Sequence, residues 1–156
     1  MLGMQFLSSS EKYNIMKIYF SKFGATIDTS DKKTVKITSE FRIRVTSEGI
    51  QDFFNSGNNL SRPFTLVKYS SNVGDKYEFT DMDNKKITRE VVYKSTDNDY
   101  EIGFFRIKVM KIDEIEDDPM YKKITYVANH KYGLVGIIIT LNNNKTVTLS
   151  LSPANM

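Results

Sequence analysis

The chain contains no cysteine and a single histidine, and both scarcities restrict its chemistry. Without cysteine it has neither a disulfide framework nor a thiolate for nucleophilic catalysis or metal binding. The absence of cysteine is compatible with both a reducing and an oxidising compartment. A histidine-based zinc site usually needs two or three His or Cys ligands, which this chain does not supply. We therefore expect no metal and no cofactor.

The one histidine, His130, has little catalytic context. A Ser-His-Asp arrangement would need partners such as Ser150, Asp97 or Asp99, and the sequence has no Gly-x-Ser-x-Gly elbow. His130 also falls in a polar turn between two apolar segments, where a capping or solvent-facing role is the common one. The sequence predicts a protein that is not an enzyme.

Charge of one sign and long apolar runs are also scarce. Lys and Arg outnumber Asp and Glu by 22 to 19, a formal net charge of +3, which is too small for a domain that holds nucleic acid through its phosphates. No segment reaches the ~20 apolar residues of a membrane-spanning helix. Residues 1–10 lack the charged and apolar parts of a secretory signal, so we expect either a cytoplasmic chain or one whose leader was removed.

The acidic and glycine-containing segments do not match known ligand loops. Residues 81–92 begin like a calcium loop, but they lack the glycine at position six and the glutamate at position twelve. The acidic segment 113–118 could bind a hard cation weakly, although such runs are usually solvated surface. Each glycine stands singly, so no glycine-rich phosphate loop precedes a helix.

The longest uninterrupted apolar segment is residues 133–141, Gly-Leu-Val-Gly-Ile-Ile-Ile-Thr-Leu. Its β-branched content favours a strand over a buried helix. Alternate residues of a regular strand face opposite sides, one made of Val135, Ile137, Ile139 and Leu141 and the other of Leu134 and Ile138. Because both sides are apolar, we predict a central strand that is covered on both faces.

From residue 64 onward, alternating segments and turn residues follow each other at regular spacing. The segments predicted to be strands are 64–69, 76–80, 87–93, 100–112, 121–128, 133–141 and 146–151. They are joined by turns rich in Asn, Asp and Gly and by no crossover helix, so we expect antiparallel pairing in sequence order. The pattern predicts a mainly β fold with one or two short helices, in a single domain of residues 1–156. The antiparallel meander would form a curved sheet, a half-barrel or a barrel.

Residues 13–23 support two interpretations. A capping box at residues 8–11 and apolar residues at helical spacing favour a helix. The alternating segment 34–45 needs a partner strand of similar length, which favours a strand for the same residues. We prefer this long hairpin, in which Gly24 would be a bulge.

The clearest helix signal is in residues 48–55. Ser47 can cap the N-terminus and Gly57 can end the helix. Three apolar residues, Ile50, Phe53 and Phe54, form its apolar stripe. The sequence predicts one short helix there.

Two segments repeat a pattern of aromatic, cationic and β-branched residues: 41–45 (Phe-Arg-Ile-Arg-Val) and 105–109 (Phe-Arg-Ile-Lys-Val). Each places two cations on the face opposite its apolar residues. If the two strands lie side by side, their cations form a stripe. Together with exposed aromatic rings beside it, this stripe would suit single-stranded nucleic acid or an anionic glycan. The alternative is that these cations are ordinary solvent-facing residues that pair with Glu across strands. The candidate binding residues are Arg42, Arg44, Arg106, Lys108, Phe104 and Tyr126.

Two further segments, 73–79 (Val-Gly-Asp-Lys-Tyr-Glu-Phe) and 126–136 (Tyr-Val-Ala-Asn-His-Lys-Tyr-Gly-Leu-Val-Gly), resemble parts of secreted or lipid-anchored β-rich domains of uncharacterised function from gut-type bacteria. In such domains a Val-Gly-Asp-x-aromatic turn opens a meander of strands. The resemblance covers residues 64–151. It implies a cell-envelope or secreted location and a curved antiparallel sheet similar to that of periplasmic lipoprotein carriers, and it brings no catalytic residues.

The sequence thus predicts a non-enzymatic binding or structural module of the bacterial cell envelope, with no transmembrane segment. Its expected partner is a small apolar ligand, a glycan or an envelope protein. The second hypothesis is a barrel that binds single-stranded nucleic acid or another polyanion, although the low net charge argues against nucleic acid. The third is a small enzyme built on His130 and a carboxylate, which would require that histidine to lie beside a cleft.

Overall fold

The computed structural model describes residues 8–28, 36–39 and 42–151, and the side chains of all of these except 25–28 and 36–39. The described chain is mainly β, as predicted. The elements in chain order are α1 (Ser9–Phe23), β1 (Ala25–Asp28), β2 (Lys36–Ser39), β3 (Ile43–Val45), β4 (Gly49–Asp52), the 3-10 turn η1 (Phe54–Ser56), β5 (Phe64–Lys68), β6 (Lys76–Thr80), β7 (Lys86–Lys94), β8 (Tyr100–Ile102), β9 (Phe105–Ile107), β10 (Met110–Ile115), β11 (Tyr121–Asn129), β12 (Gly133–Leu141) and β13 (Thr146–Ser150).

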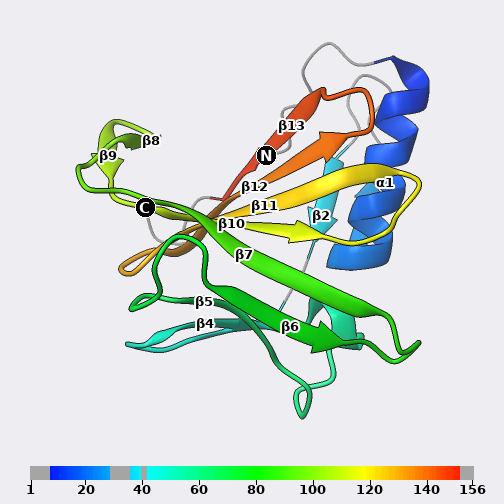
Figure 1. Ribbon diagram of the computed structural model, residues 1–156. Helices are drawn as coiled ribbons and strands as arrows, with labels where there is room; N and C mark the ends of the chain where they lie inside the picture. The colour runs from blue at the N-terminus through cyan, green and yellow to red at the C-terminus, as the bar shows by residue number, and fades with distance from the viewer. Residues whose placement is uncertain (1–7, 29–35, 40–41, 152–156) are drawn as a thin grey trace.

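The described strands form four antiparallel sheets. The largest has the order β13-β12-β11-β10-β7-β6, the second is β3-β4-β5, and β1-β2 and β8-β9 are two-stranded. Figure 1 shows the large sheet twisting strongly, with α1 near one end of its strands and with β4 and β5 beside β6, below β7. No sheet in the described part of the chain closes into a barrel. Of the predicted shapes, the structure therefore has the open, curved sheet.

The strand β12 is an interior strand, as predicted, because it pairs with β11 on one side and β13 on the other. Eight of its nine residues are buried. A bulge changes which residues share a face: Leu134 belongs to the main core, whereas Val135 packs in a second cluster behind the sheet. The predicted faces of these two residues were wrong, because one extra residue shifts the alternation of a strand.

The hairpin β8–β9, which we call the arm (residues 100–107), covers the second face of β11 and β12. Its residues Ile102 and Ile107 pack with Val127 and Val135 in the second cluster. The single strand predicted for 100–112 was wrong. Gly103, with a φ of 60°, reverses the chain so that β8 pairs with β9, and β10 starts afresh between β7 and β11.

The preferred strand within residues 13–23 was also wrong, because α1 is a helix. Its capping box is complete: Ser8 Oγ accepts from the Glu11 N–H, and the Glu11 carboxylate accepts from the Ser8 N–H. Gly24 ends the helix with a φ of 58° and is not a bulge. The short strand β1 pairs with β2, so no longer partner is needed.

The helix predicted for residues 48–55 was wrong as well, since the chain there forms β4 and then η1. Gly49 passes so close to β5 that a Cβ on it would lie 2.1 Å from the Val67 carbonyl oxygen. Strand pairing on both sides therefore overrides the local helix signal. The predicted strand 34–45 is divided between β2 and β3, while residues 34–35 and 40–41 lie outside the described part of the chain.

Candidate functional site

The two strands with the repeated cationic pattern are not neighbours. The strand β3 pairs with β4, and β9 pairs with β8, so the predicted stripe is not formed by strand pairing. Arg42 and Arg44 are exposed on the three-stranded sheet, where Arg44 lies over the Phe53 ring and donates to the Gln51 side-chain oxygen. Arg106 and Lys108 are exposed on and just after the arm.

The two aromatic candidates have opposite environments. Phe104 is fully exposed at the tip of the arm, in agreement with its predicted exposure. Tyr126 is fully buried, so the prediction of an exposed ring was wrong. Its hydroxyl donates to Glu114 over 3.2 Å, inside a group of buried ionised side chains.

This group, which we call the buried charge cluster, links α1 to both larger sheets. Its members are Lys22, Asp52, Arg89, Glu114 and Glu116. Arg89 has no exposed surface; its Nε donates to Glu114 over 2.6 Å, and its Nη1 donates to Asp52 and to the Thr65 carbonyl oxygen. Lys22 of α1 forms ion pairs with Glu114 and Glu116.

Pairing keeps Arg89 and Glu114 of the buried charge cluster ionised, whereas burial raises the pKa of Asp52 despite its ion pair with Arg89. Burial favours the neutral form of each group, but the charges of Arg89 and Lys22 outweigh it and lower the pKa of Glu114 to about 2. In the same way, Asp52 and Glu114 outweigh burial and raise the pKa of Arg89. The rings of Phe64 and Tyr126 lie 3.8 and 5.0 Å from the Arg89 guanidinium carbon. Arg89 and Glu114, held ionised in this way, are not poised to exchange protons with a substrate.

The sequence contains a signal for this cluster that the predictions did not include. Arg89 alternates in phase with Ile87 and Val91, which are buried, and Glu114 is in phase with the buried Ile112. A charged residue in phase with apolar neighbours on a strand points into the core. The interpretation of 113–118 as solvated surface was wrong for Asp113 and Glu114, which are buried in β10.

A second group of cations surrounds an open hollow between the arm and the β11–β12 turn. The hollow has a volume of about 240 Å³, and no carboxylate lines it. Its three cations are Arg106, Lys108 and Lys131. Within the described residues, none of them has a carboxylate oxygen within 4.0 Å. We call this site the basic hollow and define it by Phe105, Arg106, Lys108, His130, Lys131 and Tyr132.

Asn129 holds the turn of the basic hollow in place. Its Oδ1 accepts from the N–H groups of Lys131 and Tyr132, and its Nδ2 donates to the Lys108 carbonyl oxygen over 2.7 Å. The Tyr132 ring lies 5.8 Å from the Phe105 ring, and Lys131 Nζ lies 5.2 Å over the Tyr132 ring. The hollow is therefore a preorganised surface of cations and aromatic rings that suits an anionic ligand.

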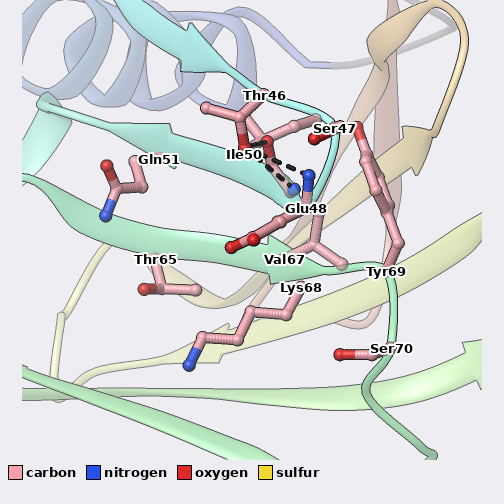
Figure 2. Close-up of a pocket in the computed structure, with 11 residues that line it drawn as sticks. Thr46, Ser47, Glu48, Ile50, Gln51, Thr65, Val67, Lys68, Tyr69 and Ser70 are labelled. Carbon is pink, nitrogen blue, oxygen red and sulfur yellow. Dashed lines mark hydrogen bonds between the residues drawn. The ribbon is translucent and has the colours of Figure 1, made fainter.

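A larger hollow, with a volume of about 620 Å³, lies between the β3–β4 turn and β5, and its lining residues are drawn in Figure 2. Glu48 and Lys68 project into it, and Thr46 fixes the turn by accepting from the N–H groups of Glu48 and Gly49. The Tyr69 hydroxyl is buried and has no hydrogen-bond partner among the described residues, and burial raises its pKa. The Tyr69 ring also meets His130 edge-on at 6.4 Å, so the two hollows adjoin.

His130 is exposed, and two of the residues considered as its triad partners have other contacts or lie in other elements. Asp99 accepts from the hydroxyls of Ser95 and Tyr93, and Ser150 lies in β13, opposite Gly136.

In the described residues, no group of three or more His, Asp or Glu side chains is arranged to hold a metal ion. Likewise, the helical part of the described chain offers no segment with the length and hydropathy of a membrane span.

In comparisons with known proteins, no family model, no curated protein and no solved structure matches the chain.

Proposed function

We propose that the chain is a non-enzymatic binding module of the cell envelope, and that it binds an anionic partner at the basic hollow. The observation that carries this proposal is the set of three cations, Arg106, Lys108 and Lys131, which line one hollow and form no ion pair with a described carboxylate. Like charges gathered in this way repel each other and raise the local concentration of anions. An anionic partner would relieve that repulsion.

Ordinary surface pairing does not account for the basic hollow. On the neighbouring strands β6 and β7, exposed lysines do pair with glutamates across the sheet: Lys86 with Glu78 and Lys76 with Glu90. The arm has one opposing acid, Glu101, which faces Arg106 in the hairpin register but lies beyond ion-pair distance. The chain thus neutralises one exposed surface and leaves the other positive.

The inner face of the large sheet is a weaker candidate for ligand binding. Helix α1 packs Ile15, Ile18 and Phe23 into the main core against that sheet. The chain's own helix therefore takes the place that a small apolar ligand would occupy in a half-barrel carrier. This supports binding through the loops over binding inside the sheet.

The proposal that the module is not an enzyme rests on where its reactive groups lie. Three fully buried ionisable residues, Asp52, Arg89 and Glu114, are paired with each other in the buried charge cluster, and none of them lines either hollow. The exposed His130 adjoins cations and aromatic rings, which can bind an anion but cannot orient an imidazole as a carboxylate does.

Heparin, a soluble polyanion, provides the test. The triple variant R106E/K108E/K131E reverses the charge of the basic hollow, and K12E/K17E/K122E is the matched control on α1 and β11, at three exposed lysines without carboxylate partners in the described chain. We expect wild-type binding that weakens as salt increases, a loss of at least about tenfold in the first variant, and a much smaller loss in the control. Absence of heparin binding at low salt, or equal losses in the two variants, would contradict the proposal.

A further inference from the structure

We propose that the anionic partner is a phospholipid surface and that the arm inserts the Phe104 ring into it. This inference rests on the proposed function, and it names the class of partner for the basic hollow. Three features carry it: the position of Phe104, the attachment of the arm to the sheet, and the cations behind the tip.

Phe104 occupies the outermost position of the arm. Ile102 pairs with Phe105, so the hairpin turns through Gly103 and Phe104 alone, with Gly103 in the left-handed region. The Phe104 side chain is fully exposed. Transfer of such an exposed aromatic ring from water into an apolar partner lowers the free energy, so the tip is suited to binding.

The arm cannot bury this ring by folding back onto its own sheet. Ile102 and Ile107 are fixed in the second cluster beneath it. At its base, the Tyr100 hydroxyl rests on β12, so closely that a Cβ at Gly136 would lie 2.8 Å away. The inner face of the hairpin is therefore occupied, and Phe104 projects outward from a fixed support.

The shape of the tip favours a lipid surface over other anionic partners. Nucleic-acid platforms stack successive bases on rings that lie along a groove, whereas Phe104 stands on a convex turn. A protein partner would need a matching pocket for the ring. The interface of a bilayer accepts a projecting aromatic ring without any preformed pocket.

The cations lie where headgroups would meet them. Arg106 follows the tip in β9, Lys108 comes just after the hairpin, and Lys131 comes from the adjoining turn. Each cation near an anionic bilayer strengthens binding by about fivefold. Stable attachment to the bilayer needs this attraction together with an inserted apolar group. The Phe104 tip and the basic hollow together supply both signals, so we expect selective binding to anionic bilayers.

The chain has no tryptophan, so Phe104→Trp places a single fluorescent reporter at the tip without touching the core. The probes are vesicles of phosphatidylcholine alone and vesicles that also contain phosphatidylglycerol, each with and without brominated acyl chains. We expect a blue shift and bromine quenching only with the anionic vesicles. The control Tyr13→Trp, on the exposed side of α1, should show neither change.

Two more variants separate insertion from simple attraction. Phe104→Ser should weaken anionic-vesicle binding by about tenfold while leaving heparin binding unchanged, because it removes the inserted ring and no charge. Adding R106E/K108E/K131E to Phe104→Trp should weaken vesicle binding by at least about a hundredfold, because the loss of three cations accounts for about fivefold each and the new carboxylates are repelled by the anionic surface.

The outcomes distinguish this inference from the function on which it rests. If heparin binds but anionic vesicles leave the emission of the Phe104→Trp variant unmoved, the lipid partner is wrong and the anion-binding module stands. The same conclusion follows if single-stranded DNA, and no vesicle, shifts that emission. An equal shift for the Tyr13→Trp control would also overturn insertion through the arm. Absence of binding to heparin and vesicles alike would overturn both proposals.

Discussion

Two groups of basic residues in this chain have opposite surroundings. Arg89 and Lys22 are buried, and every one of their charges meets a carboxylate. Arg106, Lys108 and Lys131 are exposed at one end of the molecule, and no carboxylate in the described chain pairs with them. The comparison separates charges that hold the fold together from charges that are available to a partner, a distinction that net charge alone conceals.

The energetic consequences of the two groups should differ in the same way. Removing one partner from a buried ion pair leaves an uncompensated charge in the interior, which destabilises strongly. Removing an exposed cation without a partner changes only solvation and weak long-range forces. Stability and binding should therefore respond to different substitutions.

Arg89→Met should produce the largest effect, because it leaves Asp52 and Glu114 buried with fewer counter-charges. We expect the free energy of unfolding to fall by about 3–5 kcal/mol, measured by urea denaturation. The matched change Arg106→Met on the arm should alter it by less than about 0.5 kcal/mol. Similar losses from both substitutions would remove the distinction between the two groups.

Glu114 makes the comparison dependent on pH. Its pKa is about 2 in the folded chain, below the ordinary value of 4.5, so folding favours the ionised form. The stability from this group is fully present above pH 4.5 and is lost as pH falls toward 2. Urea denaturation across this range should show the wild-type advantage over Glu114→Gln, about 3 kcal/mol near neutral pH, shrinking as the solution is acidified. An advantage that is independent of pH would contradict the ionised pair.

Gly136→Ala tests whether the arm is anchored as the structure shows. The new Cβ would lie 2.8 Å from the Tyr100 hydroxyl, which is the far end of a flexible side chain, so we expect a loss of about 1 kcal/mol, at the low end of overpacking costs. Tyr100→Phe removes that oxygen, so the double variant should recover most of the loss in a thermal unfolding measurement. If the second substitution recovers nothing, Tyr100 does not rest on Gly136.

The strands and turns with strong local signals were predictable from the sequence. β12 was identified from its doubly apolar pattern, and the turns after β6 and β12 contain Asn84 and Asn144 in the left-handed region that such turns favour. The segments that failed are those where tertiary contacts compete with local pattern. Gly49–Asp52 looks helical alone and becomes a strand only because β3 and β5 lie on either side.

The candidate site was predicted in part, for a similar reason. Phe104 and Arg106 do lie together on the arm and Lys108 lies just after it, because the three are neighbours in sequence. Lys131 and Tyr132 were missed, since only the packing of the arm onto β11 and β12 brings their turn beside it. Tyr126 was assigned to the surface because the strand alternation did not reveal the buried charge cluster that surrounds it.

The smallest effect on stability should come from R106E/K108E/K131E, the variant with the largest effect on binding. These side chains are exposed and unpaired in the described chain, so the free energy of unfolding should change by about 0.5 kcal/mol or less. The pair of measurements on this variant, heparin affinity and the free energy of unfolding by urea, tests the central distinction most directly. We predict a loss of affinity of at least about tenfold with nearly unchanged stability. Wild-type affinity, or a loss of stability as large as that of Arg89→Met, would contradict it.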